Sequence, residues 1–411
     1  MKLGMNIESV QRSNRSLALR LMLDYKSISR VALAKKTGLK KATITNIINE
    51  FIEMGIIEES GQTRGEFGRK TDTLRLNVPG ARIISLRITR KYYEIDMYDL
   101  HGNKQTGIKE SIDIHGDIQN IYESVKSNLW KMIDEIGLVN ILGLCAGVPG
   151  PYIQNGRNIS LVTGFEQLKK ISIREELEKE FSFPIFVEHD AKIAAFAEWK
   201  HWCHETKKHE GTLIEILSTG QGVGAGIIID DKIIKGKLGV AGEIGYMGIN
   251  FNGPISESGN RGIFEYYSSS ESVKRHILDR MKEFKQVTLT ENSSADEIYR
   301  EYEEGNPLAV WAVEQTAWYL GYGIAGLVSI LNPDAVIIGS DYPRSAKFIN
   351  AVKSTVKKLV YEEFYDSLII EFSQVEGNAT LLGGFHLVID RLFSSNQIFD
   401  QIKSIVASNK V

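Results

Sequence analysis

A polar helix face and a basic, glycine-rich segment lie close together near the start of the chain, and both carry side chains that can bind nucleic acid. The polar face holds Lys40, Lys41, Thr43, Thr45, Asn46 and Asn49, and the basic segment holds Arg64, Arg69 and Lys70. Lysine, threonine and asparagine can contact phosphates and base edges in the major groove. Arginine and lysine in a wing can reach phosphates or a narrow minor groove. Together with Arg30, these residues are the candidate DNA contacts.

Three helices and a hairpin are expected to position those side chains. A leucine-rich helix comes first, and Ser29 is placed to cap the second helix. Gly38 breaks the second helix, and a third begins near Lys41 with apolar residues at three- and four-residue steps. Helix, glycine turn and polar-faced helix predict a helix-turn-helix, whose last helix enters the major groove. Strands at 56–60 and 72–76 would then frame a wing.

The charge of this N-terminal region differs from that of the remainder. The chain has 411 residues, with 49 Lys and Arg against 52 Asp and Glu, a formal net charge of −3. Residues 1–80 hold 14 basic and 8 acidic residues, which gives +6, and the rest hold 35 and 44, which gives −9. A basic head on an acidic body favours nucleic-acid binding by the head. The alternative is a winged protein-contact domain with a solvated basic face.

Composition excludes several other classes of protein. The two cysteines, Cys145 and Cys203, do not form a Cys-x-x-Cys pair, so neither a disulfide framework nor a thiolate zinc cluster is expected. The N-terminus shows no apolar run followed by a small-residue cleavage site, and no stretch approaches 18 apolar residues. We therefore expect a cytoplasmic protein without membrane contact.

From residue 81 onward, strands alternate with helices, which is typical of an α/β fold. Residues 77–80, Asn-Val-Pro-Gly, mark a boundary before this body. The expected strands are 81–87, 93–98, 141–146, 185–187, 212–217 and 336–338. We also expect a glycine-rich loop at 220–226, a hairpin turn at Asp230-Asp231 and a last helix opened by Gly383-Gly384.

Five segments of this body resemble the ROK family (repressor, open reading frame, kinase). Ser218–Gly226 resembles its phosphate loop, and Ala241–Gly245 with Gly259–Glu265 resembles its sugar-binding signature. Glu188-His189-Asp190-Ala191 is similar to its Glu-Asn-Asp-Ala, and residues 331–339 are similar to its late strand. The order and spacing match, and with the winged head the resemblance covers nearly the whole chain.

The resemblance implies a winged helix-turn-helix followed by a two-lobed, actin-like sugar-kinase domain of the ribonuclease H-like class. It places the head at 1–80, the first lobe at 81–193 and the second lobe at 194–389, with a C-terminal helix at about 390–411 completing the first lobe. Family kinases phosphorylate a hexose in the interlobe cleft with ATP and magnesium. Family repressors keep the cleft as a sugar sensor and use the head on operator DNA.

The loop that would bind ATP departs from the family pattern. Family kinases carry Asp-x-Gly-Gly-Thr-Lys after the first strand, where this chain has Leu86-Arg87-Ile88-Thr89-Arg90-Lys91. Both glycines and the acid are missing, and bulky side chains cannot form that tight backbone cradle. Neither ATP as a cofactor nor sugar phosphorylation is therefore expected, although the later glycines at 220–226 persist.

Carried over residue by residue, the resemblance also implies a sugar site. Asp190 matches the family's catalytic base, and without a phosphate donor it can still accept a hydrogen bond from a sugar hydroxyl. Glu243 and Glu265 match further acceptors, and Gly164 matches a loop over the sugar. His189 replaces the usual asparagine, which implies an altered sugar preference. Taken alone, each acid could instead be a surface charge or a helix cap.

The structural zinc site of many family members is altered as well. Tyr246 stands at its histidine position, and Ser256, Ser258 and Ile263 stand at its cysteine positions. Isoleucine cannot bind metal and neutral serine is a poor ligand, so no metal is expected. Tyr246 is expected to take over a sugar contact of that histidine. Packing of Phe251, Ile263 and Phe264 is expected to order the loop instead.

The leading prediction is a sugar-responsive transcriptional repressor without enzymatic activity, similar to xylose and N-acetylglucosamine repressors. It would bind a palindromic operator as a homodimer or homotetramer and take a sugar or sugar phosphate in the interlobe cleft. The Gly259–Gly262 segment favours the xylose type. One alternative is an ATP-dependent sugar kinase, with or without a regulatory role. Another is a constitutive DNA binder whose sugar site is vestigial.

Overall fold

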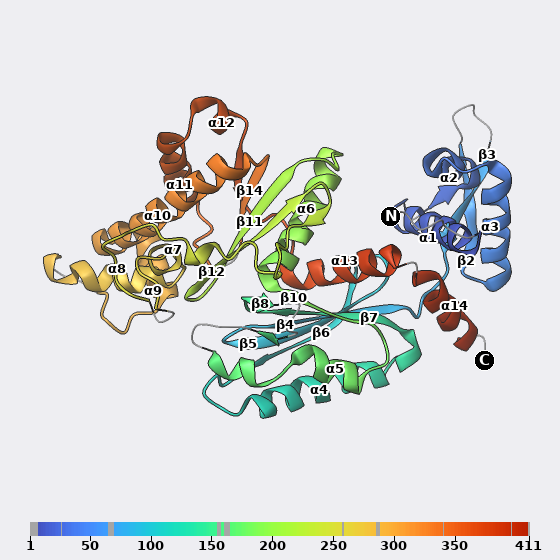
Figure 1. The fold of residues 1–411 in the computed structure, drawn as a ribbon, viewed down its shortest axis with the longest axis horizontal. Coiled ribbons are helices and arrows are strands. Elements are labelled where there is room, and N and C mark those ends of the chain that lie inside the picture. The colour runs from blue at the N-terminus through green and yellow to red at the C-terminus, as the bar shows by residue number, and fades with distance from the viewer. Residues whose placement is uncertain are drawn as a thin grey trace.

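The chain folds into a small N-terminal head and two larger lobes, which stand apart in Figure 1. The structure is a computed structural model, and it describes residues 7–25, 27–64, 70–153, 158–159, 165–256, 259–284, 288–339, 341–395 and 397–409. The head lies at the right of the view, the first lobe at the bottom and the second lobe at the upper left. No helix in these ranges is long and apolar enough to cross a membrane.

The head has the elements of a winged helix-turn-helix. They are α1 (Ile7–Tyr25), β1 (Ile28–Ser29), α2 (Arg30–Thr37), α3 (Lys41–Met54), β2 (Ile57–Arg64) and β3 (Lys70–Leu76), with the strands in the order β1-β3-β2. Ser29 caps α2 by accepting a hydrogen bond from the Ala32 amide, as predicted. Gly38 and Gly55 end α2 and α3 in the left-handed backbone region, which favours glycine.

Each lobe is built on a five-stranded mixed sheet of the same topology. The first sheet runs β10-β7-β4-β5-β6 and the second runs β13-β12-β11-β14-β15. Their strands are β4 (Arg82–Ile88), β5 (Tyr92–Tyr98), β6 (Lys104–Ser111), β7 (Ile141–Val148) and β10 (Ile185–His189), then β11 (Thr212–Thr219), β12 (Gly222–Ile229), β13 (Lys232–Ile233), β14 (Ala335–Ile338) and β15 (Ile369–Phe372). In both sheets the first strand is central, with an antiparallel hairpin partner on one side and a parallel strand on the other.

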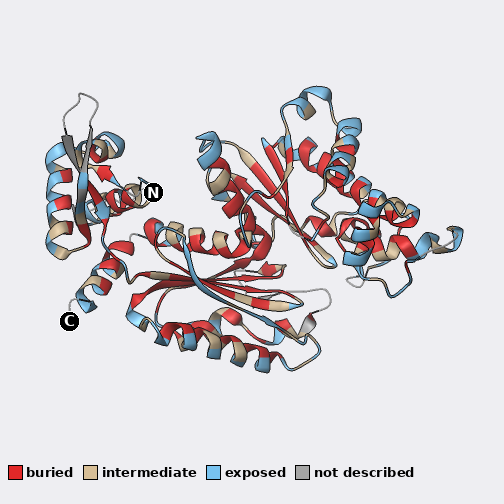
Figure 2. Ribbon diagram, turned by 180° about the vertical axis from the view of Figure 1, so that it is seen from behind, coloured by how far each residue is buried: buried red, intermediate tan, exposed pale blue. Residues whose placement is uncertain are grey.

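Helices cover the outer faces of both sheets. In the first lobe, α4 (Ile118–Asp134) and α5 (Ile173–Glu180) bury their apolar residues against the sheet. In the second lobe, α10 (Pro307–Leu331) and α11 (Ala346–Leu359) do the same. Smaller elements are β8 (Tyr152–Ile153), β9 (Asn158–Ile159), α7 (Phe264–Ser268), α8 (Ser272–Arg280), α9 (Ala295–Glu304), α12 (Glu362–Asp366), and 3-10 helices at Leu138–Asn140, Glu166–Lys170, Ile244–Tyr246 and Met281–Glu283. Figure 2 shows the sheets as buried layers beneath these partly exposed helices.

Two helices fill the space between the lobes. Helix α6 (Asp190–Thr206) packs on β11 and β12, α13 (Ala379–Ser394) packs on β4 and β7, and the two helices pack on each other. A Cβ at Gly383 would lie 1.9 Å from the Ile193 carbonyl oxygen, so this crossing requires glycine. The chain thus returns to the first lobe by Ala379, earlier than the expected boundary near 390. Gly383 and Gly384 lie inside α13, so the prediction that they open the last helix was wrong.

The glycine-rich stretch after Thr219 forms a strand, and the prediction of a loop over 220–226 was wrong. Strand β12 begins at Gly222, and only the turn before it is irregular. A Cβ at Gly226 would lie 2.3 Å from the Ala195 Cβ on α6. The glycines therefore let strand and helix approach closely. The predicted turn at Asp230-Asp231 is confirmed, because both residues have positive φ between β12 and β13.

The head is fastened to the body by the C-terminal helices. Helix α14 (Ile398–Ser408) lies between the head and the first lobe in Figure 1. Phe399 of α14 stacks on Phe51 of α3, with ring centroids 5.5 Å apart. Arg20 of α1 pairs with Asp390 of α13 at 3.6 Å. One buried apolar cluster runs from the head through α14 and α13 to α6, so the head shares a core with the body.

Candidate functional site

A pocket opens between the lobes at the carboxyl ends of β7 and β10. These strands are parallel, Val148 pairs with His189 at their ends, and α6 starts at the next residue. The enclosed free space of the pocket is about 30 Å³, and it rises to about 420 Å³ when the part open to solvent is included. The carboxyl ends of parallel strands are where open α/β sheets bind small ligands. Polar side chains from both lobes converge there: Arg90, His189, Asp190, Thr219, Glu243, Tyr246 and Glu265.

Five of the six residues predicted to contact sugar line this pocket. They are His189, Asp190, Glu243, Tyr246 and Glu265. The sixth, Gly164, lies outside the described residues. The sequence reasoning thus placed distant segments together correctly, and their contact with a sugar stays a prediction.

His189 lies between two of the carboxylates. Its Nε2 is 3.3 Å from Asp190 Oδ1, and its Nδ1 is 3.4 Å from Glu243 Oε1. The 3.4 Å contact does not meet hydrogen-bond geometry, and the described part of the chain provides no other partner for these two buried atoms. Buried polar atoms are normally paired, so these two are placed to bind a polar ligand. A Cβ at Gly150 would lie 2.7 Å from both side chains, so only glycine lets the loop after β7 approach them.

Asp190 is held by groups of the protein itself. Its Oδ2 is 3.5 Å from Arg87 Nη2, and the two side chains are only 5% and 6% exposed. Its Oδ1 accepts a hydrogen bond from the Ala191 amide at 2.9 Å. Arg87 also donates to the Asn378 side chain at 3.4 Å, and Asn378 caps α13. A buried arginine therefore balances the charge of the family's base position and connects it to the start of α13.

Glu265 contributes a carboxyl group with an unusual pKa. Burial raises the pKa of Glu265 to about 6, and a hydrogen bond from the Val223 amide opposes that shift. Glu265 lies in the first turn of α7, beside Gly245, where an added Cβ would be 2.6 Å from Glu265 Oε2. A carboxyl that titrates near pH 6 can both donate to and accept from a hydroxyl.

Arg90 bridges the two hairpins that flank the pocket. It lies in the β4–β5 hairpin, and its Nη1 donates to the Thr219 carbonyl of the β11–β12 hairpin at 3.3 Å. The guanidinium lies over Gly222, where an added Cβ would be 3.4 Å from Nη1. The Gly220 amide donates to Asp341 Oδ2 at 3.1 Å. A side chain thus crosses this space and the Gly220 amide already has an acceptor, while the expectation that no ATP binds here stays a prediction.

The loop between Tyr246 and Glu265 is ordered mainly by its own backbone. Bridges join Gly248 to Ile263 and Ile255 to Arg261. Ile263 and Phe264 are buried, as predicted, but Phe251 is 95% exposed and the prediction that it packs was wrong. The backbone bridges hold the loop without that ring.

The positions that match zinc ligands in other family members carry side chains that are not zinc ligands. Ile263 is buried in the second-lobe core region, and Tyr246 lines the pocket beside Glu243. The Ser256 amide donates to the Asn260 carbonyl at 2.7 Å within the loop, while Ser258 lies outside the described residues. The expectation that this loop binds no zinc stays a prediction.

Helix α3 presents the predicted polar face to solvent. Its buried side carries Ile44, Ile47, Ile48 and Phe51. Thr43 is half-buried, and the exposed candidates are Lys40, Lys41, Thr45, Asn46 and Asn49. The Thr45 hydroxyl donates to the Lys41 carbonyl at 2.9 Å within the helix. Arg30 is paired with Glu59 at 3.3 Å, so it joins α2 to β2 in addition to any role toward DNA.

The wing follows as a two-stranded hairpin. Arg64 and Lys70 pair across β2 and β3 in register. Arg69 lies outside the described residues, as do the side chains of Arg64 and Lys70. Their contact with DNA stays a prediction.

Sequence reasoning missed Arg87, Arg90 and Asn378 as parts of the site. In sequence, the first two stand out only as residues that do not match a glycine loop. Their partners lie far away along the chain, and Arg87 and Asn378 are 291 positions apart. A positively charged residue near the end of an otherwise apolar strand was the available signal, since a buried charge needs a partner.

Known proteins resemble this chain in sequence and in fold. A model described as the ROK family matches residues 93–391. The xylose repressor of Caldicellulosiruptor bescii is 27% identical over 396 residues, 94% of this chain and 97% of that protein. A crystal structure of a ROK family transcriptional regulator, a homolog of the Escherichia coli MLC protein, has a TM-score of 0.79 and 24% identity, covering 97% of this chain and 99% of that one. A ROK family glucokinase from Streptomyces griseus, in complex with glucose and AMPPNP, has a TM-score of 0.63 and 22% identity, covering 75% and 99%.

Proposed function

The chain belongs to the ROK family, and from this premise we propose that it is a sugar-responsive transcriptional repressor without phosphoryl-transfer activity. The head binds operator DNA, and the interlobe pocket binds a sugar or sugar phosphate as inducer. Because winged heads read palindromes in pairs, the proposal includes a homodimer or homotetramer. Xylose, named in the repressor of Caldicellulosiruptor bescii, is the first sugar to test.

The observation that carries this proposal is the path of helix α13 from the pocket to the head. At its start, Asn378 contacts Arg87, which pairs with Asp190. Near its end, Asp390 pairs with Arg20 of the head. A helix of 16 residues spans about 24 Å. A sugar hydroxyl that competes with Arg87 for Asp190 would therefore act on a rigid element that also holds the head.

The effector is tested by thermal denaturation in the presence of monosaccharides and their phosphates. A sugar that binds only the folded protein stabilises it by about 2.7 kcal/mol at 100 times its Kd. Xylose, glucose and N-acetylglucosamine should be compared, each with and without phosphate. Asp190→Asn should lose the sugar-induced shift and retain operator binding. A full sugar response in that variant would refute the assignment of the pocket.

Operator binding is tested by fluorescence anisotropy with a promoter fragment over a range of salt concentrations. Lys41→Ala should weaken binding to all sequences and lower the salt slope by about 1, because one phosphate contact is lost. Asn46→Ala should relax base preference at one position. Lys131→Ala, on the exposed side of α4, is the charge-matched control. Unchanged binding in both head variants would remove the argument for DNA recognition through α3.

The absence of kinase activity is proposed from Arg90 and Arg87. The first crosses the space between the hairpins, and the second pairs with the residue that would act as base. A coupled assay with ATP, magnesium and the same sugars should give no turnover. Clear sugar phosphorylation would instead establish the kinase alternative.

A further inference from the structure

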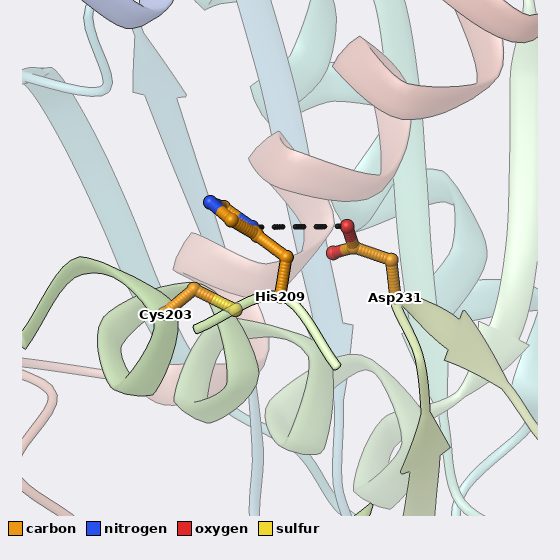
Figure 3. Close-up of side chains that lie close together, drawn as sticks. All are labelled: Cys203, His209 and Asp231. Atoms are coloured by element: carbon orange, nitrogen blue, oxygen red, sulfur yellow. Dashed lines mark ion pairs between the residues drawn. The ribbon is translucent and has the colours of Figure 1, made fainter. Parts of the chain in front are cut away.

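Three potential metal ligands converge at an edge of the second lobe that the proposed function does not use. Cys203 lies in the last turn of α6, His209 in the loop that follows, and Asp231 in the β12–β13 turn. One ligand atom from each lies within 4.8 Å of the other two. Figure 3 shows the three side chains side by side, with His209 Nδ1 and Asp231 Oδ2 joined at 3.9 Å.

The surrounding structure orients Asp231. Asp230 and Asp231 have φ values of 48° and 65°, which place them in a tight hairpin turn. Asp231 Oδ1 accepts hydrogen bonds from Trp199 Nε1 and Lys200 Nζ, both at 2.7 Å. Both of these partners contact Oδ1, and the other oxygen, Oδ2, lies toward His209. Hydrogen bonds of this kind to the outer oxygen orient a carboxylate that binds metal through the other.

The other two ligands differ in exposure. Cys203 is 5% exposed and lies under the loop, whereas His209 is exposed. Zinc binds the thiolate form of cysteine, so binding would release the proton of the Cys203 thiol. His209 can adjust its rotamer at little cost because it lies on a surface loop.

We propose that Cys203, His209 and Asp231 bind one zinc-class divalent ion, with a fourth coordination position open. Zinc binds cysteine sulfur, histidine nitrogen and carboxylate oxygen in tetrahedral geometry, with bonds of about 2.0–2.3 Å. Such bonds set neighbouring ligand atoms roughly 3.5 Å apart, so the cluster closes by about 1 Å on binding. Calcium and magnesium prefer sets of oxygen ligands and do not suit a thiolate.

The site faces the head. Asp24, near the end of α1, is within electrostatic reach of Lys200, His209 and Asp231. An ion at the site would meet a carboxylate of the head across this gap, directly or through water. It would therefore connect the second lobe to the head at a place separate from the α13 and α14 contacts.

Metal content of the purified full chain tests the site. The protein is incubated with excess Zn²⁺, passed through gel filtration and analysed by mass spectrometry for bound zinc. We expect one ion per wild-type chain and less than a tenth of that in His209→Ala. His204→Ala, which changes an exposed histidine on the same helix end, should retain the ion. Asp24→Asn should weaken zinc affinity by about tenfold if that carboxylate supports the site.

Cobalt provides a second, spectroscopic readout. Co²⁺ titration should give a thiolate-to-metal absorption band in wild type and in Cys145→Ser, but not in Cys203→Ser. His209→Ala should fold normally because the residue is exposed, and circular dichroism checks this. Equal zinc affinity in wild type and His209→Ala, or an unchanged cobalt band in Cys203→Ser, overturns the proposal. These measurements need neither operator nor sugar, so their failure would leave the proposed repressor function standing.

Discussion

The β4–β5 and β11–β12 hairpins occupy equivalent places in two sheets of the same topology. The turn of one is rich in glycine, whereas the turn of the other carries long basic side chains. The second-lobe hairpin reads Ser-Thr-Gly-Gln-Gly over 218–222, and the first-lobe hairpin reads Ile-Thr-Arg-Lys-Tyr over 88–92. One exposes backbone to the pocket, and the other lays the Arg90 guanidinium across it. A few side chains on one hairpin therefore change what the cleft can bind while the fold is kept.

The strands that lead into these hairpins differ in the same way. Arg87 is the penultimate residue of β4, and Ser218 is the penultimate residue of β11. Both are buried, but Ser218 is neutral and accepts a hydrogen bond from the Ser270 amide at 2.9 Å. Arg87 instead forms a buried ion pair. At matched positions the first lobe therefore has a buried ion pair and the second lobe has hydrogen bonds between neutral groups.

The largest effect is expected from Arg87→Ala. It would leave Asp190 buried without its cation, and removing one partner of a buried pair costs about 3–5 kcal/mol. Ser218→Ala, at the matched position of the second lobe, should cost about 1 kcal/mol. Urea denaturation of both variants measures the difference. Equal losses in free energy of unfolding would mean that the ion pair is not the feature that separates the two strands.

The next effect concerns the glycines of the second lobe. In Gly224→Ala, the new Cβ would lie 2.9 Å from His189 Cε1, so the ring must move. Overpacking of this kind costs about 1–3 kcal/mol, and displacement of His189 should abolish the sugar-induced thermal shift. Gly248→Ala is the control, because no atom lies within 4 Å of its added Cβ. A normal sugar response in Gly224→Ala would show that these glycines do not shape the pocket.

A smaller effect should depend on pH, through Glu265 beside β12. Its pKa is raised from 4.5 to about 6, so the folded state holds the proton more tightly than the unfolded chain. The resulting stabilisation is complete below pH 4.5 and is lost as the pH rises through 6. The difference between the two pKa values corresponds to about 2 kcal/mol of stability, because one pKa unit is worth about 1.36 kcal/mol.

Glu265→Gln should remove this part of the pH dependence. Denaturation at several pH values between 4 and 7 measures the pH dependence of stability. Glu175→Gln is the control, because Glu175 is exposed. If the profiles of wild type and Glu265→Gln are parallel, the raised pKa is contradicted.

The smallest effect is expected from Arg90→Ala. The side chain is only partly buried and its hydrogen bond to the Thr219 carbonyl is long at 3.3 Å, so its loss should cost about 1 kcal/mol. Nucleotides should still not stabilise the variant, because Arg87 and the other bulky hairpin residues remain. A thermal shift with ATP and magnesium in Arg90→Ala, but not in wild type, would show that this one side chain closes the cleft to nucleotide.

Local signals made most of the fold predictable. The cap at Ser29, the left-handed glycines at 38 and 55 and the Asp230-Asp231 turn act over a few residues, and each was found where the sequence placed it. The failures came from packing at long range. The glycines of β12 face α6, and those of α13 face α6 and the first sheet, contacts that no local pattern contains.

The sequence predicted the acidic side chains of the pocket but not the arginines beside them. The segments holding His189, Glu243 and Glu265 were identified by resemblance, and the structure brings them together. The resemblance had no counterpart for Arg87 or Arg90, because their roles depend on partners in other elements. The cluster of Cys203, His209 and Asp231 was missed for the same reason, since the third ligand comes from a separate hairpin.

The docking of α14 against the head has a consequence for biosynthesis. The head emerges from the ribosome well before the helix that carries Phe399, because more than 300 residues separate Leu76 from Ile398. At about 5–20 residues per second, the head waits roughly 15–65 s for this partner. During that interval Phe51 lacks its stacking ring. Nascent chains, and products truncated before Ile398, therefore carry a head that lacks the part of its apolar core contributed by α14.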